Sequence, residues 1–160
     1  MKELEQQYTF AQWLLQDEWL CNECLAHLRP DPRLLRLDEL KLFYFVTSEG
    51  EVYLNDRSYP DIAKSMLFNC RPDALVVGGA AAGVGPGGEL LEEVRAAAKG
   101  VPVVCGTGCK KETVAQILNN CDGAFVGTTF KKDGVFDNHA ETARVRSFMD
   151  KVKAFRGTLD

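Results

Sequence analysis

Short apolar runs alternate with stretches of helical periodicity from Lys41 to the C-terminus. The apolar runs are Leu42–Val46, Ala74–Val77, Val101–Cys105 and Ala124–Val126. The helical patterns that follow them cover Ser58–Asn69, Glu89–Lys99, Glu112–Asn120 and Ala140–Phe155. Each run begins about 20 to 30 residues after the one before, which is the length of a βαβ unit. The sequence therefore predicts an α/β fold in which parallel βα repeats are joined by right-handed crossovers.

Local signals agree with this pattern. Ala74–Val77 is apolar without alternation, which is typical of a parallel strand covered on both faces. Pro60 fits only the first turn of its helix, and Gly100 is placed to end the next one. Asn138 and Glu141 predict a capping box at the start of the last helix.

Two strand-to-helix turns within Val101–Gly134 are rich in glycine and threonine. Gly106-Thr107-Gly108 follows one apolar run, and Gly127-Thr128-Thr129 follows the next. Neighbouring parallel strands would bring both turns to one rim of the sheet, where backbone N–H groups and hydroxyls suit a phosphate. The residues that we expect to bind phosphate are Gly106, Thr107, Gly108, Gly127, Thr128, Thr129 and Lys131.

A plainer interpretation of these turns stays open. Gly106, Gly108 and Gly127 would then only close tight turns, and Lys131 with Lys132 would be a solvated surface pair. In an eight-stranded βα barrel, however, the loops after the last two strands often hold a phosphate. The chain ends one helix after the second turn, which favours the phosphate interpretation.

A second glycine motif, Gly83-Val84-Gly85-Pro86-Gly87-Gly88, matches the G-x-G-x-x-G dinucleotide fingerprint. The strand before it ends near Val77, too far upstream for the tight turn that the fingerprint needs. Pro86 lacks an amide proton, and no acid follows Cys105 to bind a ribose. We therefore expect a loop over the rim of the sheet and no cofactor.

Residues Leu4–Leu28 show an amphipathic helical pattern that Pro30 and Pro32 end. The predicted organisation is an N-terminal helix over residues 1–32 and a (βα)4 unit over residues 33–160. Cys21-Asn22-Glu23-Cys24 and His27 fall within the helix. Buried cysteines explain them better than zinc or redox chemistry, because a second ligand pair is missing nearby and the motif does not open the helix.

The composition is that of an ordinary globular domain of 160 residues, 46% hydrophobic and 26% charged. A net charge of −4 without a basic stripe argues against nucleic acid as a partner. No apolar run reaches the ~20 residues of a membrane span. The polar start, MKELEQQYTF, is not a secretory signal. Six dispersed cysteines suggest reduced thiols, and hence an intracellular protein in the cytoplasm or an organelle.

The segment from Asp56 to Phe155 resembles the BtpA/SgcQ family, named for a photosystem I biogenesis factor. The resemblance is carried by DRSYPDIAKSMLF, DALVVGGAAAG, ELLEEVR, VPVVCGTG, DGAFVGTTFKKDGVFDN and ETARVR. The most distinctive stretch is Val126–Gly134. The resemblance covers roughly the last 100 to 115 residues, and the segment before Lys41 does not share it.

The family is similar to the ribulose-phosphate-binding TIM barrels, which have eight strands. The resemblance therefore implies that this chain holds a half, or truncated, TIM barrel of four strands behind a long N-terminal helix. Such a sheet has open edges and an uncovered inner face, which are aggregation hazards. The N-terminal helix would cover that face, two copies would pair as a homodimer, or the chain would be a truncated or spliced product of marginal stability. Of these we favour the helix as the cover.

The resemblance implies a phosphorylated small molecule as ligand, bound at the loops after the last two strands, with catalysis doubtful. Candidate acid/base groups are Glu49, Asp56 and Asp133, but no pair has convincing spacing, and His139 is a poor candidate. The catalytic residues therefore stay unassigned. One alternative is an active phosphosugar enzyme. Another is a non-catalytic assembly or biogenesis factor with the N-terminal helix as its partner surface.

Overall fold

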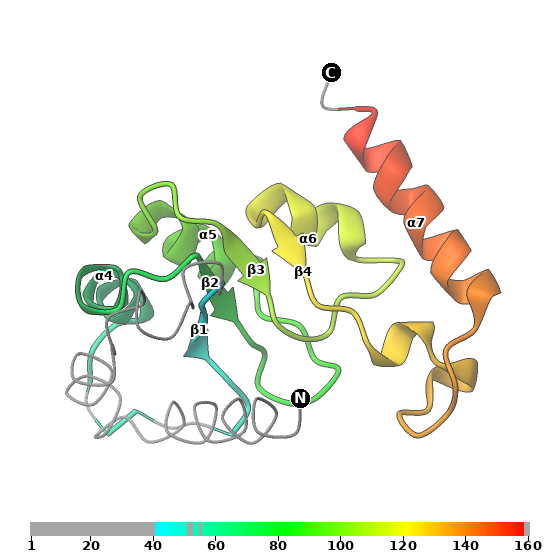
Figure 1. Ribbon diagram of the computed structural model, residues 1–160, viewed down its shortest axis with the longest axis horizontal. Coiled ribbons are helices and arrows are strands. Elements are labelled where there is room, and N and C mark those ends of the chain that lie inside the picture. Colours follow the sequence, from blue (N-terminus) through cyan, green and yellow to red (C-terminus); the bar gives the residue numbers. More distant parts are fainter. Residues whose placement is uncertain (1–40, 51–52, 55, 159–160) are drawn as a thin grey trace, which may run out of the picture.

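The structure, a computed structural model, describes residues 41–50, 53, 54 and 56–158 (Figure 1). The predicted N-terminal helix of residues 1–32, with Cys21, Cys24 and His27, lies outside the described residues.

A four-stranded parallel sheet forms the centre of the described chain. Its strands are β1 (Phe43–Thr47), β2 (Ala74–Val77), β3 (Val103–Cys105) and β4 (Gly123–Ala124). They lie side by side in chain order, and every neighbouring pair is parallel. This arrangement confirms the predicted α/β fold and is consistent with part of a TIM barrel.

Each strand is followed by a helix, as the sequence predicts. The α-helices are α4 (Tyr59–Asn69), α5 (Gly88–Ala97), α6 (Val114–Asn120) and α7 (Thr142–Arg156). Ser58 begins α4 as its N-cap, because its hydroxyl accepts the Asp61 amide at 3.3 Å, and Pro60 occupies the first turn. Lys99 and Gly100 have positive φ angles of 50° and 90°, which turn the chain after α5.

The segment between β4 and α7 differs from the prediction. β4 ends at Ala124, and two 3₁₀ turns follow, η1 (Thr128–Phe130) and η2 (Lys132–Gly134). The predicted capping box is wrong. Glu141 is the N-cap of α7 without a side-chain hydrogen bond, and Nδ2 of the Asn138 side chain donates instead to the Lys132 carbonyl at 3.0 Å.

The two faces of the sheet have different neighbours. One face packs in a single core with buried residues of all four α-helices. Its side chains come from alternate strand positions, namely Tyr44, Val46, Leu75, Val77, Val103 and Cys105. In Figure 1, α4, α5 and α6 follow one another along this side of the curved sheet, and α7 stands beyond α6.

The opposite face, which we call the open face, is formed by the intervening positions. Ala74, Val76 and Val104 form a small buried cluster there. Three phenylalanines flank it, and Phe43, Phe45 and Phe125 are 43%, 38% and 47% exposed. The Phe43 and Phe125 rings lie 6.1 Å apart, so the open face is apolar from one edge strand to the other.

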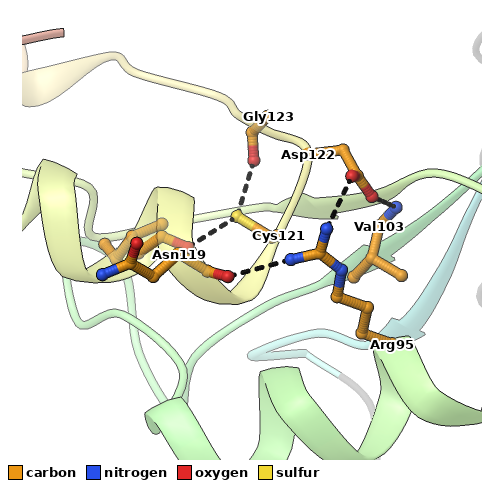
Figure 2. Close-up of polar contacts among 7 residues, drawn as sticks. Arg95, Val103, Asn119, Cys121, Asp122 and Gly123 are labelled. Carbon is orange, nitrogen blue, oxygen red and sulfur yellow. Dashed lines mark hydrogen bonds and ion pairs between the residues drawn. The ribbon is translucent and has the colours of Figure 1, made fainter. Parts of the chain in front are cut away.

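An aspartate precedes each of β2 and β4 and binds the amide at the start of the strand beside it. Asp73 accepts the Leu42 amide at 2.9 Å, and Asp122 accepts the Val103 amide at 2.9 Å. Figure 2 shows that Arg95 from α5 bridges the second acid, at 3.3 Å, to the Asn119 carbonyl, at 2.9 Å. These acids therefore fix the amino-terminal end of the sheet, opposite the glycine turns.

Candidate functional site

The two predicted turns lie next to each other at the carboxyl end of the sheet. β3 pairs with β4 through Val104 opposite Gly123 and Cys105 opposite Ala124, so the chain leaves both strands at the same rim. The Thr129 hydroxyl donates to the Cys109 carbonyl at 2.9 Å and ties the second turn to the first. The structure therefore brings the predicted residues into one region.

Thr107 links the first turn to the glycine-rich loop that follows β2. Its hydroxyl accepts the Gly79 amide at 3.0 Å and donates to the Val84 carbonyl at 2.9 Å. The Thr107 hydroxyl therefore both accepts and donates a hydrogen bond within the protein. The Thr129 hydroxyl likewise donates to the Cys109 carbonyl. A ligand at this rim would meet backbone amides more readily than these two hydroxyls.

Gly106 and Gly108 are glycines for packing reasons. A Cβ on Gly106 would lie 2.9 Å from a methyl group of Val76 and 3.2 Å from the Phe45 ring. Gly108 has a φ of +70°, and a Cβ there would overlap the backbone of Gly85. These contacts support the plainer interpretation of the first turn, in which its glycines allow the neighbouring loop to approach.

Gly127 is different, because a Cβ there would have nothing within 4 Å. It is exposed and immediately precedes η1. The Phe130 amide donates to the Gly127 carbonyl at 2.9 Å, and the Lys131 amide to the Thr128 carbonyl at 3.0 Å. The amides of Thr128 and Thr129 are the first two of this short turn, so no carbonyl earlier in the turn can accept a hydrogen bond from them. The open space at Gly127 thus lies beside these two amides, in the segment that follows β4.

Lys131, the predicted cation, directly follows this turn. The Lys131 ammonium lies 5.7 Å from the centre of the Phe136 ring, and its carbonyl accepts from Arg144 Nε at 3.0 Å. Phe130 packs edge-on against Phe148, with ring centres 5.2 Å apart. Contacts from α7 therefore fix the backbone on both sides of Lys131, while the side chain of Lys132 is exposed.

The candidate acids and the histidine do not form a catalytic pair. Glu49, Asp56, Asp133 and His139 are all exposed, and they come from different segments. Asp133 has a φ of 57° within η2, and the His139 carbonyl accepts the Lys132 amide at 2.8 Å. Nothing in this arrangement assigns a general acid or base.

Three buried cysteines lie under the first turn, and sequence reasoning did not single them out. Cys105, Cys109 and Cys121 all face the helix-side core. Burial raises the pKa of the Cys105 thiol to about 11 and that of Cys109 to about 12, and neighbouring thiols add to both shifts. Cys105 also donates to the Thr107 carbonyl at 3.1 Å. These thiols are therefore neutral packing groups rather than nucleophiles.

A groove of about 520 Å³ lies elsewhere, between α6 and α7. It is lined by Lys111, Glu112, Val114, Ala115, Lys151, Ala154, Phe155 and Thr158. These residues do not include the predicted phosphate-binding set, so the groove is separate from the turns.

No helix in the described part of the chain is long and apolar enough to cross a membrane.

Comparison with known proteins gives one family and several relatives. The sequence model of the BtpA family matches residues 15–154. The match begins well before Asp56, so the expectation that the segment before Lys41 is unlike the family is wrong from residue 15 onward. No solved structure matches the chain.

The curated relatives are longer proteins. "Putative sgc region protein SgcQ" of Escherichia coli (strain K12) is 42% identical over 118 residues, which are 74% of this chain and 44% of that protein. "Photosystem I biogenesis protein BtpA" of Synechocystis is 31% identical over 80 residues, 50% of this chain and 28% of that protein. "Uncharacterized protein TK2179" of Thermococcus kodakarensis is 28% identical over 134 residues, 84% of this chain and 50% of that protein. The chain thus spans half or less of the relatives that it matches.

Proposed function

Because this chain belongs to the BtpA family, and because its two glycine turns adjoin at one rim of a parallel βα sheet, we propose that it binds a phosphorylated small molecule there. The observation that carries the proposal is the unobstructed Gly127, which is directly followed by the amides of Thr128 and Thr129 at the start of η1. Loops after the last two strands are a frequent phosphate position in βα barrels.

The geometry sharpens the roles of the predicted residues. The amides of Thr128 and Thr129 would donate to phosphate oxygens, and Gly127 would allow the close approach. Lys131 would supply a positive charge after leaving the Phe136 ring, a contact worth only about 0.5–1 kcal/mol at an exposed site. Gly106, Thr107 and Gly108 would shape the wall of the site, since their packing and hydrogen bonds are used within the protein.

A thermal-shift titration with inorganic phosphate and with ribose 5-phosphate tests the proposal. Either ligand should raise the melting temperature of the wild-type chain, because a ligand that binds only the folded state stabilises it. Gly127→Asp should abolish the shift, since its carboxylate would occupy the open space and repel the anion.

Gly87→Asp is the matched control for this substitution. A Cβ at Gly87 also has nothing within 4 Å, and an aspartate suits its position as the N-cap of α5. This variant adds the same charge at another open glycine away from Gly127, so it should keep the ligand-induced shift. Equal shifts in the wild type and Gly127→Asp would exclude the proposed site.

The proposal includes the cellular setting and a homodimer. Cys105, Cys109 and Cys121 are buried thiols in the described chain, which favours a reducing compartment inside the cell. Within the described residues the sheet ends at β1 and β4, and its open face is apolar, which favours association with a second copy.

A further inference from the structure

We infer that Arg144, in the first turn of α7, is a positioning residue of the proposed phosphate site. Its Nε–H, rather than its positive charge, holds the backbone that follows η1, so that the amides of η1 keep the orientation in which they meet the ligand. The inference rests on the proposed function for the ligand. It adds to that function a residue that lies outside the two glycine turns.

The first support is the hydrogen bond that Arg144 makes. Its Nε donates to the Lys131 carbonyl at 3.0 Å. Lys131 directly follows η1, and its own amide donates to the Thr128 carbonyl at 3.0 Å. Two successive hydrogen bonds therefore connect Arg144, through the Lys131 backbone, to the first residue of η1.

The second support is that α7 also holds the preceding residue. The Glu141 amide, at the N-cap of α7, donates to the Phe130 carbonyl at 2.8 Å. The Phe130 side chain is anchored separately, because its ring packs edge-on against the buried Phe148. Loss of the Arg144 bond would therefore release one backbone contact of this segment and leave its aromatic anchor in place.

The third support is the way in which Arg144 uses its guanidinium. Within the part of the chain that the structure describes, Nε makes both of its polar contacts, at 3.0 Å from the Lys131 carbonyl and 3.5 Å from Glu141 Oε2. The side chains of this ion pair are 37% and 42% exposed, so the pair contributes little. The hydrogen bond to the backbone is therefore the contact through which Arg144 acts.

The position of η1 shows why this contact affects the ligand. On the side of the first turn, the Thr129 hydroxyl ties η1 to the Cys109 carbonyl at 2.9 Å. Gly127 has open space around it, so the other anchors of η1 come from α7. Donors that are already oriented lose less conformational entropy when they bind an anion. Arg144 therefore strengthens binding without touching the phosphate.

Three substitutions at Arg144 separate the hydrogen bond from the charge. Glutamine has an amide N–H as many bonds from Cα as Nε, but it has no charge. Lysine keeps the charge and has a methylene group at the position of Nε. Methionine removes both the donor and the charge.

Isothermal titration calorimetry with inorganic phosphate, at a temperature where each variant is folded by circular dichroism, measures the dissociation constant. Arg144→Lys and Arg144→Met should raise it by about fivefold, as expected for the loss of one hydrogen bond. Arg144→Gln should stay within about twofold of the wild type. Arg146→Met is the matched control, since Arg146 is exposed two residues further along α7, and this variant should bind phosphate as the wild type does.

Trypsin digestion without ligand tests the positioning itself. Cleavage after Lys131 or Lys132 requires local release of the backbone. Arg144→Lys and Arg144→Met should therefore be cut there faster than the wild type, and Arg144→Gln at the wild-type rate. Mass spectrometry identifies the bond that is cut. If Arg144→Met fails to fold, the comparison of Arg144→Lys with Arg144→Gln carries both tests.

Two results would overturn the inference and leave the proposed function standing. Phosphate binding that is weakened as much by Arg144→Gln as by Arg144→Met would mean that the Nε–H alone is not enough. Wild-type affinity in Arg144→Lys would mean that the hydrogen bond is not needed. A wild-type chain that binds no phosphate would instead exclude the proposed function and the positioning role with it, even if the order of the cleavage rates is as expected.

Discussion

Gly108 has two independent reasons to be glycine. Its φ of +70° is in the left-handed region, and a Cβ would overlap the backbone of Gly85 rather than a flexible side chain. The contact holds the glycine-rich loop against the turn after β3, with Thr107 bonded to the same loop. This is a position where the local fold depends on the absence of a single carbon atom.

Gly108→Ala should lower the free energy of unfolding by at least about 2 kcal/mol, because backbone strain and overpacking add. Urea denaturation followed by circular dichroism measures the change. Gly50→Ala is the control, since a Cβ at Gly50 has nothing within 4 Å, and its effect should stay within about 0.5 kcal/mol. Equal effects in the two variants would show that the loop contact is not rigid.

The sequence predicts the positions of the site residues better than their roles. Thr107 and Thr129 lie at the rim as expected, yet their hydroxyls bind a loop and a carbonyl of the protein itself. A hydroxyl in a turn is consistent with either use, and only the tertiary fold decides which acceptor comes within reach. The open space at Gly127 is likewise a property of the assembled rim.

At the level of elements, Asp73 before β2 and Asp122 before β4 have the same role. Each accepts a hydrogen bond from the amide at the start of the preceding strand. Asp122 binds the Val103 amide at 2.9 Å and also contacts Arg95 at 3.3 Å. The side chains of this ion pair are 44% and 42% exposed, so the pair itself contributes little. The hydrogen bond to the strand amide is the stronger contribution of this carboxylate.

Asp122→Ala should therefore reduce the free energy of unfolding by about 1 kcal/mol, after allowance for solvent exposure. Arg95→Ala should cost less than half as much, because it leaves the bond to the Val103 amide intact. Thermal and urea denaturation of both variants measure the two losses. The reverse order would mean that the bridge from α5, rather than the strand amide, is the main contribution.

Regular elements are predicted closely, whereas irregular ones are not. β2 begins and ends where the apolar run does, because a short apolar run between turns that is rich in β-branched residues is typical of a buried strand. β4 covers Gly123–Ala124, so it begins one residue before its predicted run and ends two residues earlier, although the Phe125 amide still donates to the Cys105 carbonyl at 2.8 Å. The capping box predicted at the start of α7 is wrong because the Asn138 side chain donates to the Lys132 carbonyl instead, a contact created by the fold of η2.

For the whole molecule, the buried cysteines give stability a definite pH dependence. The unfolded Cys109 thiol ionises near 9.0, whereas burial raises its folded pKa to about 12. Between these values the unfolded chain has released a proton that the folded chain keeps, so a rise in pH favours unfolding. Below 9.0 both states are protonated, and this thiol has no effect on the pH dependence.

The free energy of unfolding should therefore fall above pH 9.0 more steeply in the wild type than in Cys109→Ala. The cavity in the variant lowers stability by an amount that does not change with pH, so the difference between the two proteins isolates the thiol. Urea denaturation at a series of alkaline pH values measures it. A difference that stays constant would mean that the thiol ionises equally in both states.

The order of the sheet also determines how the chain finds its fold. Each strand pairs with the next one in sequence, and α4, α5, α6 and α7 contact one another in the same order. Contacts are therefore formed mainly between neighbouring βα units, as in a repeat protein, and folding can start within any adjacent pair and spread outward. Such an architecture can gain or lose a βα unit at either end without changing the pairing of the others.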